Sequence, residues 1–168
     1  ALVQCINQAQ AYNTPTGSDI ATTPAASLSA IDPEKYRITA EMVLPEVQPI
    51  VTIGGATVAI AGNVTSLTAE AKSGKSGFAT VLLAGAIADG DYDGLPDVWI
   101  KPNPERKAVI HLDCEQSPQD LQYNSRAINR RAGVKATPDH LYLYGIRTLP
   151  TEQYRHFTRE VCLAAAER

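Results

Sequence analysis

The chain has 168 residues, a formal net charge of −3 and a hydrophobic content of 44%. This length suffices for one domain with its own core, and the small net charge gives no electrostatic basis for binding nucleic acid or acidic membranes. No apolar run approaches the length of a bilayer span. Residues 1–5 lack the basic and long apolar regions of a signal peptide. We therefore expect a globular domain whose targeting segment was removed or not needed.

The N-terminal third of the chain is predicted to change from helix to strand. Apolar residues recur at helical spacing over residues 1–12, which predicts a helix with one apolar stripe. Residues 13–33 are rich in Thr, Ser, Ala and Pro and predict a long surface loop. Partial alternation of apolar and polar residues over 36–44 indicates the first strand.

Strand patterns dominate the middle of the chain. Short apolar segments are separated by Gly54-Gly55 and Gly62-Asn63, residues that tolerate positive φ and are typical of hairpin turns. The longest apolar run, 78–87, is predicted to be the central strand, joined by an acidic turn at 89–97 to the next strand. The predicted strands are 36–44, 49–53, 57–61, 66–72, 78–87, 98–101 and 108–112.

A helix start is encoded after the last of these strands. Ser117 is a favourable N-cap, Pro118 suits the first helical position, and Asp120 places an acid in the first turn. We expect this helix to run to Arg131, with Gly133 closing it.

The chain is predicted to end in a short strand at 140–144 and a second helix at 151–168. The resulting order predicts an α+β fold in which the N-terminal helix packs on an antiparallel sheet. In this interpretation residues 1–114 form the helix-and-sheet domain. Residues 115–168 form a helical C-terminal extension that packs on the same domain.

Three cysteines, Cys5, Cys114 and Cys162, bear on the redox compartment. None belongs to a Cys-x-x-Cys pair and no histidine lies at metal-ligand spacing from them, which disfavours a zinc site. One disulfide and one free thiol would suit an exported protein, and we favour Cys114–Cys162 because each adjoins a predicted C-terminal element. Three buried thiols in a reducing compartment are the alternative.

The densest group of ionisable residues is the acidic turn. Asp89, Asp91, Asp93 and Asp97 surround Gly94, which allows a sharp bend. Carboxylates that alternate in this way can turn their oxygens onto one hard cation, and without a cation they would repel one another. The alternative is a solvated Asp-Gly turn with no ion.

The passage from Phe78 to Ile100 carries a family resemblance. Its sequence, Phe-Ala-Thr-Val-Leu-Leu-Ala-Gly-Ala-Ile-Ala-Asp-Gly-Asp-Tyr-Asp-Gly-Leu-Pro-Asp-Val-Trp-Ile, resembles the strand, acidic turn and Val-Trp-Ile segment of bacterial type IV pilins and pseudopilins. In that family a polar turn, a strand and a cysteine often follow. Residues 101–106, residues 109–112 and Cys114 keep this order.

The resemblance implies a structural rather than an enzymatic role. Residues 1–12 would be the distal half of the pilin helix and 13–33 the connection from helix to sheet. The chain would be the extracellular, cell-surface part of a pilus or secretion pseudopilus, assembling with copies of itself or other pilin-like subunits, and held at the inner membrane before assembly only through an apolar helix absent from this sequence. No nucleic-acid partner is expected, except in a role in DNA uptake.

The acidic turn alone also resembles the calcium loops of thrombospondin type 3, dockerin and EF-hand modules. The twelfth position of that template, normally a bidentate Glu, is Ile100 here, so we expect weak calcium binding, with a dissociation constant on the order of 10⁻⁴–10⁻³ M. The ligands that this resemblance implies are Asp89, Asp91 and Asp93, the carbonyl of Leu95, and Asp97 directly or through water.

Basic and aromatic residues suggest contacts with partners. Arg126 and Arg130 share a predicted helix face and with Arg131 and Lys135 form a basic cluster. This cluster is either a solvated face or a contact with an acidic patch on a neighbouring subunit, near its acidic turn.

The aromatic residues of the predicted strands have two interpretations as well. Trp99, the only tryptophan, is expected to pack beneath the acidic turn, with an exposed recognition role as the alternative. Tyr142 and Tyr144 alternate with leucines, so either pair could face outward. Outward tyrosines together with Trp99 would suit an extracellular calcium-dependent adhesin or glycan-binding module, which is the second functional hypothesis.

The sequence contains no complete motif that indicates catalysis. Ser73-Gly-Lys-Ser-Gly77 lacks the first glycine of a phosphate-binding loop and is interpreted as a flexible connection between strands. His111, His140 and His156 lie in different predicted elements, and no Gly-x-Ser-x-Gly is present. We therefore expect no enzymatic activity, with a metal-assisted hydrolase as the third hypothesis.

Overall fold

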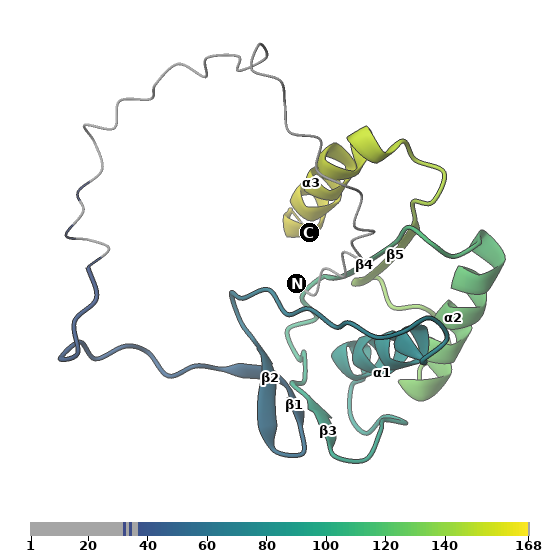
Figure 1. The fold of residues 1–168 in the computed structure, drawn as a ribbon. Helices are drawn as coiled ribbons and strands as arrows, with labels where there is room; N and C mark the ends of the chain where they lie inside the picture. The colour runs from purple at the N-terminus through teal and green to yellow at the C-terminus, as the bar shows by residue number, and fades with distance from the viewer. Residues whose placement is uncertain (1–31, 33, 35–36, 168) are drawn as a thin grey trace, which may run out of the picture. The chain divides into compact units, whose positions relative to one another are not determined.

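A computed structural model describes residues 32, 34 and 37–167 (Figure 1), and the helix predicted over residues 1–12 lies outside them. Residues 47–167 belong to one compact unit and residues 37–46 to another. The mixture of helices and strands confirms an α+β fold at this level. No described helix combines the length and apolarity that crossing a membrane requires. The elements are β1 (Pro49–Ile53), β2 (Ala56–Ile60), α1 (Lys75–Ile87), β3 (Val98–Ile100), β4 (Val109–Asp113), α2 (Pro118–Arg131), β5 (Leu141–Gly145), the 3₁₀ turn η3 (Thr151–Gln153) and α3 (Tyr154–Ala166).

The strands form two separate sheets. In the first, β1 lies between β2 and β3 and is antiparallel to both. Gly54 and Gly55 join β1 to β2 with φ values of 57° and 79°, the left-handed conformations that this turn was predicted to need. In the second sheet, β4 and β5 pair in parallel, with Val109 opposite Leu141. The prediction that 108–112 joins the antiparallel sheet is therefore wrong, although the strand itself is confirmed.

The prediction of a central strand at 78–87 is wrong, because these residues form most of α1. The run lacks the alternation that marks a half-buried strand, and its alanines and leucines favour a helix. It is apolar on every side because α1 contacts two cores: Val81 packs with the antiparallel sheet, whereas Leu83 and Ile87 pack with β4, β5 and α2. Ser73–Gly77 is likewise no strand connection, since Gly74 is the N-cap of α1.

Two further strand predictions, 36–44 and 66–72, are wrong. Residues 37–44 and 66–72 form no strand, and their apolar side chains are exposed. Neither segment has a sheet partner within the described residues, so alternation alone was a false signal there. The predicted strands 49–53, 57–61, 98–101 and 140–144 are confirmed to within two residues.

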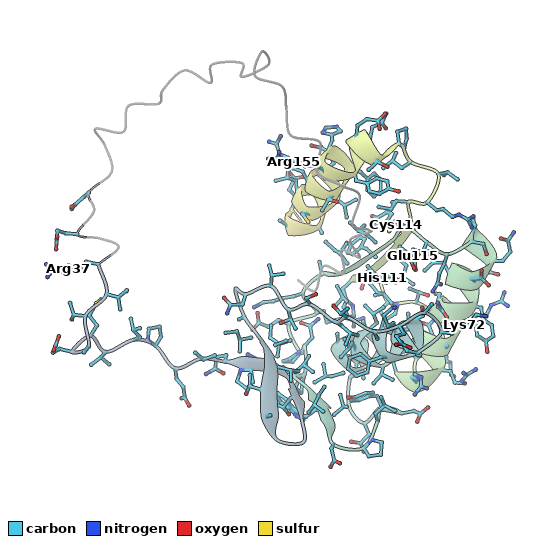
Figure 2. The ribbon with its side chains drawn as sticks, viewed as in Figure 1. Arg37, Lys72, His111, Cys114, Glu115 and Arg155 are labelled. Atoms are coloured by element: carbon cyan, nitrogen blue, oxygen red, sulfur yellow. The ribbon has the colours of Figure 1, made fainter. Side chains whose placement is uncertain are left out.

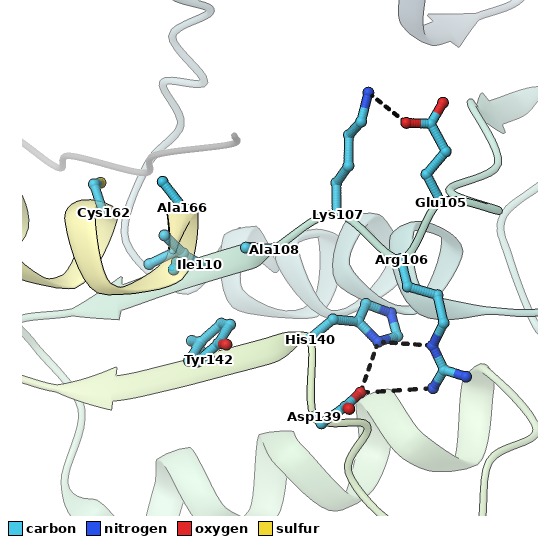
Figure 3. Close-up of a pocket in the computed structure, with 11 residues that line it drawn as sticks. Glu105, Arg106, Lys107, Ala108, Ile110, Asp139, His140, Tyr142, Cys162 and Ala166 are labelled. Carbon is cyan, nitrogen blue, oxygen red and sulfur yellow. Dashed lines mark hydrogen bonds and ion pairs between the residues drawn. The ribbon is translucent and has the colours of Figure 1, made fainter. Parts of the chain in front are cut away.

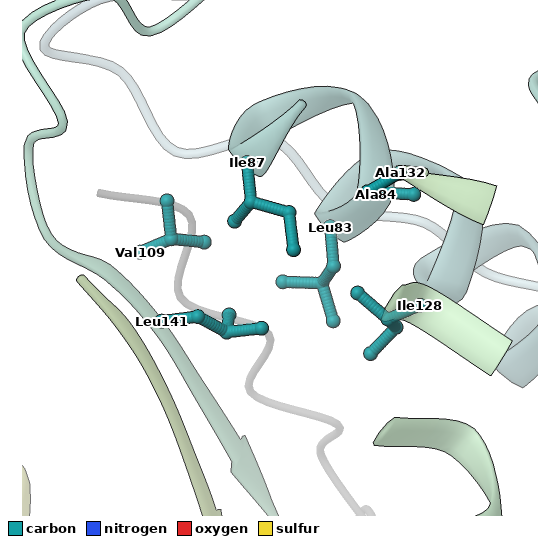
Figure 4. Close-up of a cluster of buried hydrophobic side chains, with 7 residues drawn as sticks. All are labelled: Leu83, Ala84, Ile87, Val109, Ile128, Ala132 and Leu141. Atoms are coloured by element: carbon teal, nitrogen blue, oxygen red, sulfur yellow. The ribbon is translucent and has the colours of Figure 1, made fainter. Parts of the chain in front are cut away.

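The C-terminal helices form as predicted. The Ser117 hydroxyl oxygen accepts a hydrogen bond from the Asp120 backbone N–H at 3.1 Å, and Gly133 follows α2 with φ of 68°. α2 lies beside α1, and the two helices cover one face of β4–β5, while α3 covers the other face (Figure 1). The core between α1, α2 and the parallel strands is drawn in Figure 4 and consists of Leu83, Ala84, Ile87, Val109, Ile128, Ala132 and Leu141.

Candidate functional site

The acidic turn connects α1 to β3, not two strands as predicted. Its anchor is Tyr92, which packs against both the α1–α2 core and the antiparallel-sheet core and whose hydroxyl donates to the Val98 carbonyl at 3.5 Å. Burial raises the pKa of Tyr92. A Cβ on Gly94 would come within 2.9 Å of the Tyr92 ring, so glycine here allows the ring to fold under the turn. The sequence prediction assigned this packing role to Trp99.

Arg131 supplies a positive charge to the turn from the end of α2. Its Nη1 donates to the carbonyl oxygen of Asp93 at 2.8 Å and to the carboxylate Oδ2 at 3.2 Å. In return the Asp93 backbone N–H donates to the Arg131 carbonyl at 2.7 Å. The Arg131 side chain is about three-quarters buried, so this link is better ordered than a fully exposed ion pair. Arg131 therefore contacts an acidic turn, as one hypothesis proposed. This turn belongs to its own chain and not to a neighbouring subunit.

The other two arginines of the basic cluster face solvent. Arg126 is exposed and donates to the Gln122 side chain at 3.2 Å, one helical turn away. Arg130 is exposed too. Their contact with a neighbouring subunit stays a prediction.

The four aspartates predicted to bind calcium lie at the surface of the turn. Asp89, Asp91, Asp93 and Asp97 are all exposed, and no group of three or more potential ligands is gathered among the described residues. The Leu95 carbonyl, a predicted ligand, accepts instead from the Val98 N–H at 3.2 Å. Calcium binding stays a prediction of the sequence, which a rise of melting temperature in millimolar calcium would test.

The turn is also tied to the β1–β2 hairpin. The Asp97 carbonyl accepts from the Gly54 N–H at 2.9 Å, and Asp97 adopts a left-handed φ of 62°, a conformation that aspartate tolerates better than most residues. The turn, the hairpin and α2 are therefore connected by backbone hydrogen bonds and the Arg131 side chain.

The expectation that Trp99 packs beneath the turn is wrong. Val98 and Ile100 point toward the core under the sheet, so Trp99 between them points the other way, and 46% of it is exposed. It lies opposite Thr52 of the central strand. Trp99 is therefore presented on the sheet face that α1 leaves uncovered.

The tyrosine pair of β5, for which an outward position was one alternative, is covered by α3. The rings of Tyr142 and Tyr144 stack with centroids 6.5 Å apart, and Tyr144 meets Phe157 of α3 edge to face at 5.5 Å. Both tyrosines belong to the core between α3 and β4–β5. They are thus packing residues, so the glycan contact suggested for them lacks the outward-facing rings that it requires.

The disulfide expected between Cys114 and Cys162 is not formed, because Cys162 is a free thiol among the described residues. Both cysteines border the same core, with Cys114 directly after β4 and Cys162 on α3. The prediction followed from their neighbouring elements, which do pack together, although the sulfur atoms are not joined.

A charged cluster that the sequence analysis missed ends β4 (Figure 2). Asp113 Oδ1 accepts from the backbone N–H groups of Glu115 and Gln116 at 2.9 and 2.8 Å, and Oδ2 lies 3.6 Å from His111 Nε2. Burial raises the pKa of Asp113, but the hydrogen bonds from His111, Gln116 and Glu115 together outweigh it and lower the pKa below its usual value. An Asp side chain commonly accepts a hydrogen bond from the backbone N–H two residues later, and this turn signal could have revealed the role of Asp113.

Comparison of the chain with protein-family models, curated proteins and solved structures found no match.

Proposed function

We propose that this chain is the globular part of a structural subunit of an extracellular filament of the type IV pilus or pseudopilus kind. The observation that supports it best is the uncovered face of β2–β1–β3. Trp99, at 46% exposure, is a large apolar residue left outside by a sheet whose other face packs on α1. Exposed apolar surface of this kind marks interaction sites. In a filament the occupant would be a second copy of the chain or a pilin-like subunit.

The edges of this sheet add to the support. Within the described residues β2 and β3 are its outer strands, so each presents backbone N–H and C=O groups that no further strand pairs. Open edges and an apolar face together favour docking of another subunit over a solvated surface. The subunit would work at the cell surface, where such fibres assemble.

The sequence resemblance supports only part of this proposal. Residues 89–114 keep the expected order of acidic turn, Val-Trp-Ile strand, polar turn, strand and cysteine. Residues 78–87 depart from it, because they form a helix where the resemblance implies a strand. The proposal therefore depends on the open sheet face more than on the motif.

The second candidate function is an extracellular glycan-binding module, and the exposed Trp99 also favours it, because an indole ring can stack on a sugar. The covered positions of Tyr142 and Tyr144 remove the other aromatic residues from such a site. The part of the chain that the structure describes gathers no set of three or more ligands through which calcium could act. The filament proposal is thus favoured.

Sedimentation velocity over a wide concentration range tests the proposal. The unmodified chain should associate with itself at high concentration, and Trp99→Ser should weaken this association at least tenfold. Leu163→Ser is the matched control, since Leu163 is an apolar residue of similar exposure, 48%, on α3. Association that Leu163→Ser weakens equally, or a chain that stays monomeric at every concentration, would refute the assembly surface. Binding of a glycan array that Trp99→Ser abolishes would favour the second candidate.

A further inference from the structure

A groove of about 690 Å³ lies between the parallel strands and α3, away from the acidic turn and the open sheet. One end is charged and the rest is apolar (Figure 3). The volume lies within the range of small-molecule sites. The residues of the charged end are Glu105, Arg106, Lys107, Asp139 and His140, and the apolar walls are Ala108, Ile110, Tyr142, Cys162, Ala165 and Ala166.

The charged end is held by a closed turn. The Asn103 side chain donates to the Lys107 carbonyl at 2.8 Å and accepts from the Lys107 N–H at 3.0 Å, while the Asn103 carbonyl accepts from the Arg106 N–H at 2.9 Å. These three bonds hold Arg106 at a left-handed φ of 51°. The conformation is uncommon for a residue of this size, and it directs the guanidinium toward His140.

His140 presents a ring N–H that has no partner among the described residues. It is only 7% exposed, and its Nδ1 accepts from Arg106 Nε at 3.4 Å, so in the neutral ring the proton is assigned to Nε2. Nε2 bonds to none of the described residues and lies on the far side of the ring from Asp139 (Figure 3). Among the described side chains only Asn129 Oδ1 is both buried and unpartnered, so His140 Nε2 is reached by solvent and can donate to an acceptor on a bound ligand.

The charges around His140 leave Arg106 available to an anion. Lys107 and Glu105 pair with each other at 2.9 Å, and this contact lowers the pKa of Glu105. Arg106 is held only loosely by Asp139, at 3.7 Å with both side chains exposed. The guanidinium therefore keeps N–H groups free to donate to an oxygen placed beside His140 Nε2.

We propose that the groove binds a fatty carboxylate, with its headgroup at Arg106 and His140 and its alkyl chain along α3. The wall side chains beyond the headgroup are mostly apolar, three of them alanines, and only Tyr142 and Cys162 carry a polar atom. An alkyl chain needs no hydrogen bonds from such a wall, whereas a peptide would bring backbone groups that need partners. This binding is independent of assembly through the sheet face.

Titration of the intact chain with sodium octanoate, followed by calorimetry and by NMR chemical shifts, tests the site. Octanoate should bind at least tenfold more tightly than 1-octanol, because the alcohol lacks the charge. His140→Asn keeps an acceptor for Arg106 but loses the Nε2 donor, and should weaken octanoate binding about tenfold. Arg106→Asn, which suits the left-handed backbone, should do the same. Arg147→Gln, exposed and outside the groove, should leave the affinity unchanged.

A matched pair on α3 tests the path of the alkyl chain. Ala166 lines the groove and Ala164 does not, although both are exposed. Ala166→Trp should block octanoate, whereas Ala164→Trp should not, and circular dichroism should show both folded. Equal binding of octanoate and octanol, tighter binding of an N-acetylated apolar peptide with a free C-terminus, or no binding at all would overturn the proposal.

Discussion

The two sheets of this molecule differ in how many of their faces are covered by helices. The parallel pair β4–β5 is covered on both faces, by α1 and α2 on one side and by α3 on the other. The antiparallel sheet β2–β1–β3 is covered by α1 on one face only and exposes Trp99 on the other. Strands buried on both faces consist of apolar residues with little alternation, as in Val-Ile-His-Leu and Leu-Tyr-Leu-Tyr.

We expect this difference to assign two roles: the parallel pair stabilises the fold, and the open face of the antiparallel sheet contacts other subunits. Substitutions around the parallel pair should destabilise the fold, because they leave cavities or strain in closed cores. Substitutions on the open face of the antiparallel sheet should leave stability nearly unchanged and alter association instead. Matched substitutions at buried and exposed positions test this division.

The largest effect is expected at Ile128, which is 1% exposed in the core between α2 and the parallel pair. Ile128→Ala should lower the free energy of unfolding by about 3 kcal/mol, since it removes buried methyl groups and leaves a cavity. Val58→Ala, at a 41% exposed position of the antiparallel sheet, should change it by less than about 0.5 kcal/mol. Urea unfolding followed by circular dichroism measures both, and equal losses would contradict the division.

A second comparison concerns two glycines of α1. A Cβ on Gly85 would lie 2.6 Å from Ile100 Cδ1 and 3.0 Å from the Tyr92 ring, whereas nothing lies within 4 Å of a Cβ on Gly77. Gly85→Ala should destabilise by about 1–3 kcal/mol through overpacking. Gly77→Ala should instead stabilise by about 0.5 kcal/mol, because alanine is the better helix former. Thermal unfolding should therefore shift in opposite directions, and shifts of the same sign would refute the close approach of α1 to β3.

A smaller effect is expected at the link between α2 and the acidic turn. Arg131→Gln should cost about 1 kcal/mol, because it removes two hydrogen bonds to Asp93. Arg130→Gln, one position earlier and exposed, should stay within about 0.5 kcal/mol of the unmodified chain. Chemical denaturation measures the free energy of unfolding of both variants. Equal losses of stability in the two variants would contradict the prediction.

The smallest effect concerns the acid dependence of Asp113. Its pKa is lower in the folded chain than in the unfolded chain, so the unfolded state takes up the proton first. The stability that the carboxylate contributes is complete above the unfolded pKa of about 3.9 and is lost as the pH falls through the lower folded pKa. Asp113→Asn should therefore weaken the acid-induced fall of the urea midpoint. The exposed Asp91→Asn is the control, and equal curves for the two variants would contradict the assignment.

Elements encoded locally could be predicted from the sequence. The β1–β2 hairpin follows from two adjacent glycines that adopt positive φ, and α2 follows from the Ser117 cap and Gly133. α1 could not be predicted in the same way. Its run is apolar on every side, so periodicity cannot distinguish a buried helix from a buried strand, and its length and alanine content were the neglected signals.

The contacts that build the candidate sites join distant parts of the chain. Arg131 meets Asp93 across 38 positions, and Arg106 meets His140 across 34. Each residue had an unremarkable local pattern, because pairing at such separation depends on how helices and strands pack. The acidic turn and the arginine cluster are each recognisable in the sequence, but their contact within one chain is not, and it was predicted between subunits.

Trp99 is the only tryptophan, so its fluorescence reports directly on the uncovered sheet face. The most direct test is acrylamide quenching of this fluorescence at increasing protein concentration. We predict strong quenching in the dilute chain and weaker quenching with a blue-shifted emission once copies associate through this face. Association seen by sedimentation with unchanged quenching and emission would contradict the account, because the assembly surface would then lie elsewhere.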